Sequence, residues 1–490
     1  MGETIQDRLQ LLLTLCRRQP HPESVPINKL TQIPGTPLEN QPNISAWDIL
    51  RLVAVTRIIM PHSMIRLSSG RIDLSYEQQA LCFLAGANSI FSGEKLLTVP
   101  NPNLDKDEEM FQLLGLKKKK PLCEIKMSLE KRLLTRQMLG NLRQLKLFPS
   151  LIDFSSNDYL GLARSVNFVH KVQEECHSLT QLGSTGSRLL TGHSSYVQDL
   201  EQYIALQHGF KSGLLFNCGY MANVGLLSSV ATHEDVIFFD AHIHASTRDG
   251  ITLSRAQAFP FRHNDLEHLE KRLKNCTGKA SRFLCIESLY STDGSKAPLT
   301  DMAALSKKYD AKLIVDEAHA VGVMGPDGLG LVAEHALQHD TFAQIVTFGK
   351  ALGVSGAIVL SSDLVRQALV NFATSFIYTT ALPFPSLAAI KCSYLCFPFA
   401  KKERSYLHSL IRLMQQTLSQ ASNTHIQAIP VSGNLAVKAL SQHLLEAGFD
   451  VRPLTSPTVK RGEEVLRICL HSFNTETELS RLLEKVQYAD

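Results

Sequence analysis

The sequence has 490 residues, of which 44% are hydrophobic and 20% are charged, and its formal net charge is +4. A chain of this length can bury more than one core, so we expect at least two domains. Because acids and bases nearly balance, the composition gives no sign of a nucleic-acid or membrane partner.

Two further features concern the compartment. The ten cysteines are scattered and form no CxxC pair, which is typical of a reducing environment rather than a disulfide framework. The first apolar run, Leu11 to Leu15, is short and is followed by Arg17 and Pro20, so we expect no signal peptide. No apolar stretch has the length of a membrane span. We therefore expect a cytoplasmic protein.

Strand-like and helix-like patterns alternate in the first part of the chain. Strands are predicted over 23–30, 63–69 and 88–93, and helices over 45–59 and 75–87. This βαβαβ unit is too short to close an eight-stranded barrel, so it is a partial TIM-barrel-like segment. The charged, proline-containing stretch "LKKKKPLC", from residue 116 to 123, ends the pattern. We assign 1–116 to this segment and 117–150 to a linker with an N-terminal helix.

Apolar strands recur in the next part of the chain. They are predicted over 212–216, 235–240, 282–288, 311–317, 344–348 and 356–361. Continuous apolar strands separated by helices indicate an α/β domain with a mostly parallel sheet covered on both faces, which we assign to 151–385. Longer amphipathic helices and shorter strands, including 465–470, predict a small C-terminal subdomain over 386–490.

Polar residues follow these strands, where parallel sheets carry their sites. The strand ends read "NCGYMAN", "DAHIHAS", "ESLYSTDG", "VDEAHAVG" and "TFGK". Taken singly, each has an ordinary structural explanation, such as a helix cap at Asp316 or a loop position for Lys350. His242 and His244 lack an evident third ligand, so we expect no metal site.

Taken together, the strand ends fit pyridoxal phosphate. A lysine in a partly dry pocket has a lowered pKa and can form an imine with an aldehyde, a role that suits Lys350. The cofactor also needs a carboxylate opposite its ring nitrogen and a flat group against its ring. Asp316 is placed to be the carboxylate, and His244 can stack on the ring.

The remaining cofactor contacts are predicted at neighbouring strand ends. The backbone amides of Cys218, Gly219 and Tyr220 open a helix and can hold the phosphate in its N-terminal field. Thr347, three residues before the lysine, can add a hydroxyl. His319 can hydrogen-bond the ring oxygen of the cofactor.

Six motifs resemble a known family in order and spacing. The segments "FSSNDYLGLA", "GSTGSRLLTGHS", "HASTRDGI", "VDEAHAVGVMGPDGLG", "VTFGKALGVSGA" and "IYTTALP" are similar to the pyridoxal-phosphate-dependent α-oxoamine synthases. The resemblance implies the type I fold of such transferases and a homodimer. It also implies Lys350 as the Schiff-base lysine, Ser291 as a cofactor contact, and Thr379 or Thr380 reaching the phosphate across the dimer. Asn157 and Arg452 are implied as substrate contacts.

Within that family, "SSNDYLG", "GSTGSRLLTGHS" and "VRPLTSPTV" are most similar to the 8-amino-7-oxononanoate synthases. These enzymes condense L-alanine with a pimeloyl thioester, of coenzyme A or of acyl carrier protein, and release carbon dioxide. Thr185 stands where the family usually has glycine, which affects the expected substrate fit. A sibling such as glycine C-acetyltransferase and an inactive fusion acting as a scaffold remain alternatives.

Residues 3 to 116 resemble the C-terminal part of biotin synthase, a radical enzyme. The resemblance rests on several segments, among them "MIRLSSGR", in which Arg66 matches that family's arginine ligand of an iron–sulfur cluster. The cluster-binding CxxxCxxC is absent, since the one CxxxC, Cys392 and Cys396, lies in the other segment. The preceding half of the barrel is absent too, which leaves an open sheet edge. We expect no biotin synthase activity, a fusion of two genes of one pathway, and either a remnant or a docking role for this segment.

Overall fold

The computed structural model describes residues 4–18, 21–32, 35–36, 38–91, 95–96, 99–100, 104–116, 129–145, 147, 150–179, 181–276, 278 and 280–487. The chain divides into two compact units, residues 1–129 and 130–490. Residues 117–128, which include most of "LKKKKPLC", lie outside the described residues.

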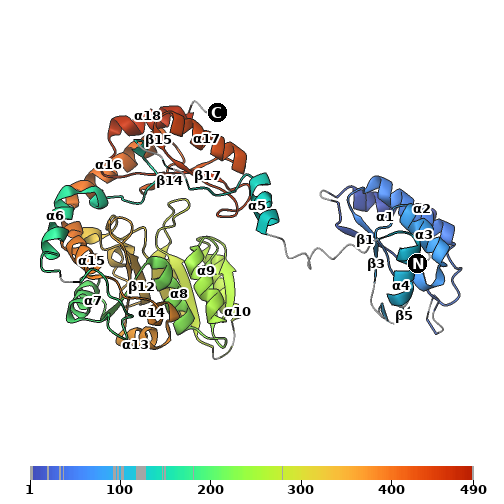
Figure 1. The fold of residues 1–490 in the computed structure, drawn as a ribbon, viewed down its shortest axis with the longest axis horizontal. Coiled ribbons are helices and arrows are strands. Elements are labelled where there is room, and N and C mark those ends of the chain that lie inside the picture. The colour runs from blue at the N-terminus through green and yellow to red at the C-terminus, as the bar shows by residue number, and fades with distance from the viewer. Residues whose placement is uncertain are drawn as a thin grey trace. The chain divides into compact units, whose positions relative to one another are not determined.

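The smaller unit contains the predicted βαβαβ pattern (Figure 1). Strands β1 (Ser24–Ile27), β2 (Met64–Leu67) and β3 (Ser89–Ile90) form a parallel sheet in the order β1-β2-β3. Helices α2 (Ala46–Ile59) and α3 (Tyr76–Leu84) connect them. These five elements confirm the prediction. The sequence did not predict α1 (Ile5–Cys16), η1 (Arg71–Asp73), β4 (Lys95–Leu96), β5 (Val99–Pro100) or α4 (Leu104–Leu113).

One face of this small sheet forms a core. Val25, Ile65 and Leu67 point to the buried side and pack with residues of α1 and α2. The alternate residues Pro26 and Met64 lie on the exposed side. This alternation follows from the two-residue period of a strand. The unit therefore has a hydrophobic core of its own.

The larger unit is built on a seven-stranded sheet in the order β7-β13-β12-β11-β10-β8-β9. Only β13 is antiparallel to its neighbours. The strands are β7 (Ser212–Phe216), β8 (Val236–Asp240), β9 (Gln257–Phe261), β10 (Arg282–Glu287), β11 (Ala311–Asp316), β12 (Thr341–Thr347) and β13 (Ala357–Ser361). All six predicted strands are confirmed, and β9 at the edge is an addition.

Helices cover both faces of the sheet, so the domain has three layers (Figure 1). Successive residues along a strand belong to different cores: Ile314 packs with one cluster and Val315 with the other. Helices α8, α9, α13 and α14 contribute to the first cluster, and α7, α10, α11 and α15 to the second. The helices and 3-10 turns of this domain are α5 (Leu129–Met138), η2 (Leu162–Arg164), α6 (Val166–Glu175), α7 (Ser195–Gln207), α8 (Gly219–Val230), α9 (Ala245–Ser254), α10 (Leu266–Asn275), α11 (Leu299–Lys308), η3 (Pro326–Gly328), α12 (Leu331–Glu334), α13 (Asp363–Phe372), α14 (Thr374–Ile377), α15 (Phe384–Cys396) and η4 (Phe397–Phe399).

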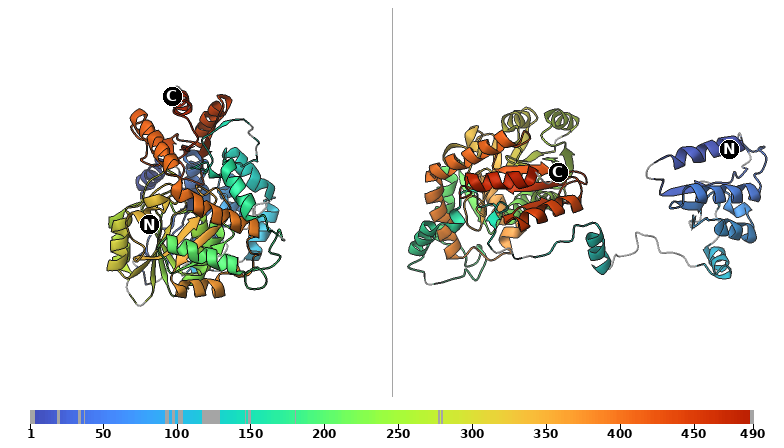
Figure 2. Two further views of the ribbon diagram at one scale, coloured as in Figure 1. Left: turned by 90° about the vertical axis from the view of Figure 1, so that its left-hand side faces the viewer. Right: turned by 90° about the horizontal axis from the view of Figure 1, so that it is seen from above.

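The C-terminal subdomain pairs an antiparallel sheet with three helices, drawn in orange to red (Figure 2). Strands β14 (Ile426–Pro430), β17 (Val465–Cys469) and β16 (Arg452–Leu454) form the sheet. The helices are α16 (Lys401–Thr417), α17 (Asn434–Glu446) and α18 (Glu476–Gln487). A short parallel pair of β6 (Ile152–Asp153) with β15 (Phe449–Asp450) brings the chain around residue 155 to this subdomain. Among the described residues, no helix is both long enough and apolar enough to cross a bilayer.

Candidate active site

Most of the residues predicted to form the site lie at the carboxyl ends of the sheet strands. Lys350 follows β12, Asp316 ends β11, and Glu287 ends β10 on the next strand. Residues 287 and 316 are direct neighbours in the parallel register. The order of the strands thus gathers chemical groups that are distant in the sequence.

Lys350 is held against a histidine. Its Nζ atom lies 2.8 Å from Nε2 of His319, which is itself 5% exposed. Burial lowers the pKa of Lys350 to about 8, and the carboxylate of Asp316 opposes part of that shift. A free amine is therefore accessible near neutral pH, as an imine-forming lysine requires.

Asp316 is fixed as an acceptor. Its Oδ1 atom accepts from the backbone N–H of Ala318 at 2.9 Å, and Oδ2 accepts from Nδ2 of Asn223 at 2.8 Å. The side chain is 6% exposed, so a cationic partner within the site would face a carboxylate with a defined orientation. Asn223, on α8, is a positioning residue that the sequence did not reveal.

The beginning of α8 fits an anion site. Cys218 is the N-cap residue and makes no side-chain capping hydrogen bond, and the helix begins at Gly219, where the first backbone N–H groups have no partner within the helix. A Cβ atom on Gly219 would lie 2.4 Å from Cγ2 of Thr347, so glycine allows the two segments to approach closely. The Oγ1 atom of Thr347 is buried and lacks a hydrogen-bond partner in the part of the chain that is described. These features fit the phosphate group of pyridoxal phosphate. Tyr220, further along the helix, hydrogen-bonds Asp249.

His244 lies at the N-cap of α9 with an exposed ring. Its Nδ1 atom accepts from the backbone N–H of Ser246 at 3.2 Å, so the proton of the neutral ring is on Nε2. The exposed ring leaves a flat surface that a planar cofactor could contact.

An arginine that the sequence did not single out completes the site. Arg467 on β17 donates from NH2 to Oδ1 of Asn157 at 3.0 Å and lies 3.4 Å from the hydroxyl of Tyr159. Its Nε atom is buried and has no partner in the described structure, which leaves a donor for a carboxylate. The sequence feature that could have indicated Arg467 is its position as the one charged residue in the apolar run "VLRICL".

Arg452, the predicted substrate contact, occupies the neighbouring strand. It stands opposite Arg467 in the β16–β17 ladder, and its Nε atom is 2.6 Å from Oδ1 of Asp450. The structure thus brings two cations to the same face of this sheet, and Arg467 hydrogen-bonds Asn157.

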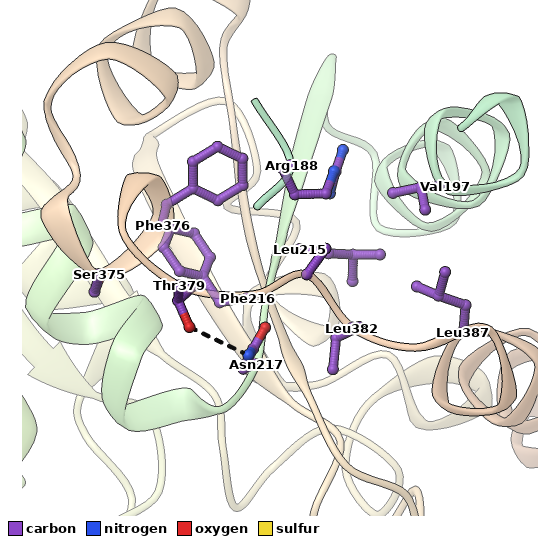
Figure 3. Close-up of a pocket in the computed structure, with 11 residues that line it drawn as sticks. Arg188, Val197, Leu215, Phe216, Asn217, Ser375, Phe376, Thr379, Leu382 and Leu387 are labelled. Atoms are coloured by element: carbon purple, nitrogen blue, oxygen red, sulfur yellow. Dashed lines mark hydrogen bonds between the residues drawn. The ribbon is translucent and has the colours of Figure 1, made fainter. Parts of the chain in front are cut away.

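The remaining predicted residues lie in loops. Ser291 follows β10. Thr379 and Thr380 follow α14. Nδ2 of Asn217 donates to the backbone carbonyl of Thr380 at 2.9 Å. The same nitrogen lies 3.5 Å from the hydroxyl of Thr379 (Figure 3). Asn217 directly precedes the N-cap of α8, so this loop of the same chain adjoins the predicted phosphate site.

Two further sets of groups bear on metal binding. His242, His263 and Asp293 bring ligand atoms within 4.8 Å of one another. The imidazole rings of the two histidines are stacked, with centroids 4.1 Å apart and an interplanar angle of 10°. Arg66 lies on β2, where Nε donates to the hydroxyl of Ser89 at 3.4 Å.

Comparisons with known proteins cover both units. A sequence model described as aminotransferase class I and II matches residues 149–486. A model of the Biotin and Thiamin Synthesis associated domain matches residues 26–117.

The larger unit is similar to two curated or solved 8-amino-7-oxononanoate synthases and to a serine palmitoyltransferase. An 8-amino-7-oxononanoate synthase of Emericella nidulans is 37% identical over 374 residues, covering 70% of this chain and 90% of the relative. The solved 8-amino-7-oxononanoate synthase of Francisella tularensis has a TM-score of 0.60 at 29% identity, covering 69% of this chain and 98% of that one. The serine palmitoyltransferase of Sphingomonas wittichii has a TM-score of 0.66 at 29% identity, covering 69% and 87%.

Proposed function

Because the chain belongs to the family of class I and II aminotransferases, we propose that it condenses L-alanine with a pimeloyl thioester and releases carbon dioxide. This is the reaction of an 8-amino-7-oxononanoate synthase, a step of biotin biosynthesis. The chain is thus an acyltransferase of the type I α/β fold that uses pyridoxal phosphate.

One observation carries the proposal. The half-buried amine of Lys350 lies 2.8 Å from His319, and a hydrogen-bonded chain leads from this histidine to a free donor on Arg467. The first group suits an aldehyde cofactor, and the second suits the carboxylate of an amino acid. Amino-acid chemistry requires both groups in one site, and the hydrogen-bonded residues join them although they come from two different sheets.

The residues around the cofactor have separate tasks. Bound pyridoxal phosphate supplies an electron-accepting ring that stabilises negative charge at the α-carbon of the amino acid. We assign Asp316 to the ring nitrogen, His244 to the ring face, and His319 to the ring oxygen. We assign the phosphate to the amides at 218–220 and to Thr347, with Ser291 as a further contact. The Thr379–Thr380 loop adjoins this site within the same chain, and a contact from the same loop of a second subunit remains the prediction from the family resemblance.

The substrate contacts follow from charge. Arg467 and Asn157 hold the amino-acid carboxylate, and Arg452 adds positive charge behind them. Lys350, whose pKa is near 8, takes the α-proton as a free amine. Its role as a base therefore strengthens as the pH rises through that value.

A sibling reaction with another amino acid is the alternative that an observation favours, since a serine palmitoyltransferase shares the fold. Purified protein should be supplied with pimeloyl thioester and either L-alanine, glycine or L-serine, and the amino ketone should be identified by mass. We expect product with alanine and at least about tenfold less with the others, because a pocket discriminates a missing methyl group or an added hydroxyl by at least about that factor. Product formed mainly from serine or glycine would reassign the substrate.

The same assay compares the two acyl carriers, pimeloyl-coenzyme A and pimeloyl-acyl carrier protein. We further propose that the enzyme is a cytoplasmic homodimer. We also propose that residues 1–116 derive from fusion with a biotin synthase gene. The segment matches a domain named for biotin and thiamin synthesis but lacks the cluster-binding CxxxCxxC, so we assign it no radical chemistry.

A further inference from the structure

A continuous hydrogen-bonded chain connects the two halves of the site. From Arg467, it passes through Oδ1 of Asn157 to the hydroxyl of Tyr159 at 2.9 Å, then to Nδ1 of His319 at 2.8 Å. From Nε2 of the same imidazole it reaches Lys350 at 2.8 Å. Tyr159 is fully buried, and its ring packs against the buried ring of His425, with centroids 4.0 Å apart.

Donor and acceptor chemistry allows one arrangement of protons in this chain. A guanidinium only donates, so the atom of Asn157 facing Arg467 is its amide oxygen. That oxygen only accepts, so Tyr159 gives its single proton to Asn157. The tyrosine oxygen must then accept from His319, which places the imidazole proton on Nδ1 and leaves a lone pair on Nε2.

At the Lys350 end of these hydrogen bonds, the same tautomer of His319 is required, with its proton on Nδ1. A protonated Lys350 can only donate, so it needs the Nε2 lone pair of His319. Burial holds the pKa of His319 well below its usual range, with Lys350, Arg467, His425 and His244 contributing in the same direction. Burial raises the pKa of Tyr159 far above its usual range. The histidine is therefore neutral with one proton, and the tyrosine keeps its own.

We propose that Tyr159 is a positioning residue that couples the carboxylate site at Arg467 and Asn157 to the proton on Lys350. When a substrate carboxylate engages these two residues, Asn157 is released and the Tyr159 hydroxyl turns to donate to Nδ1 of His319. The imidazole then carries its proton on Nε2, and Lys350 must accept as a free amine. Lys350 gives its proton to Nε2 while Nδ1 loses the proton that it held, so one proton in total passes to solvent. This inference rests on the proposed function.

Two substitutions perturb the chain without changing its charge. In Tyr159→Phe, the Nδ1 proton of His319 loses its acceptor, so Nε2 becomes a poorer acceptor for the ammonium group. In Asn157→Ala, the tyrosine hydroxyl is free to turn toward His319. Both changes lower the pKa of Lys350, so the free amine appears at lower pH. In the double variant, Asn157→Ala causes no further shift in the pKa of Lys350, because the Tyr159 hydroxyl through which it acts has been removed.

The measurement is the rate at which cofactor-free protein attaches pyridoxal phosphate to Lys350 as a function of pH. Absorbance follows the attachment, and borohydride reduction with peptide mapping assigns the residue. We expect each single variant to move the midpoint to lower pH by at least about half a unit, the effect of one hydrogen bond. Tyr394→Phe is the matched control, since that buried tyrosine bonds Nε2 of His208 at 3.0 Å within its own separate pair.

Each outcome decides a different question. An unchanged midpoint in folded Tyr159→Phe, or equal shifts by Asn157→Ala with and without the tyrosine hydroxyl, would overturn the coupling. If Tyr159→Phe does not fold, the pH midpoint of Asn157→Ala alone tests the coupling. An unchanged midpoint in Asn157→Ala would then overturn it. Wild-type protein that attaches no cofactor to Lys350 would remove the proposed function, and the coupling with it.

Discussion

Thr185 has a backbone conformation that β-branched residues rarely adopt. Its φ is 50°, in the left-handed region, and its side chain is exposed. This geometry explains the preference for glycine at the matching position of the α-oxoamine synthases. The unusual residue therefore affects backbone strain at the start of the "GSTGSR" loop.

We expect Thr185→Gly to stabilise the larger unit by up to about 1 kcal/mol, because relief of left-handed strain exceeds the added entropy of the unfolded chain. Denaturant unfolding followed by circular dichroism measures the change. Thr252→Gly is the control, since Thr252 lies inside α9, where glycine should destabilise by a similar amount. A destabilised Thr185→Gly variant would contradict the strain argument.

Individual site residues differ in how far the sequence reveals them. Lys350, Asp316 and His244 each follow an apolar strand, so their common edge could be predicted. Arg467 could not, because strand alternation gives its face but not the folding of β17 back toward β6 and Asn157. The sequence analysis did not single out Tyr159, and its role is inferred from the hydrogen bond to His319.

At the scale of elements, apolar runs predicted six sheet strands and the βαβαβ unit. The direction of β13 could not be predicted, since an apolar run carries no sign of whether it pairs parallel or antiparallel. Edge strand β9, "QAFPF", was missed because four of its five residues are exposed and one is proline. Helix α1 was read only as a short apolar run, although Thr4 and Asp7 form a capping box at its start.

At the scale of the whole molecule, the two units have separate cores. The core of residues 12 to 90 shares no member with the two cores of the larger unit. Every residue assigned to the cofactor or substrate lies beyond residue 150. We therefore expect the smaller unit to be dispensable for the chemistry.

A chain that begins at residue 129 and keeps α5 should retain cofactor binding, with kcat within about twofold of the full chain. The reason is that removal of a unit with its own core leaves the other packed. Turnover and cofactor absorbance of the two chains provide the comparison. A shortened chain that folds but loses the cofactor would assign the smaller unit a part in the site.

The central claim is that Lys350 holds pyridoxal phosphate and that alanine is the amino donor. The most direct measurement is the visible spectrum of the purified protein with and without L-alanine, followed by borohydride reduction and peptide mapping, with Lys350→Ala as control. We expect an absorbance band that alanine shifts, a reduced adduct on Lys350, and neither in the control. A protein that stays colourless after added pyridoxal phosphate, or an adduct on another lysine, would contradict this claim.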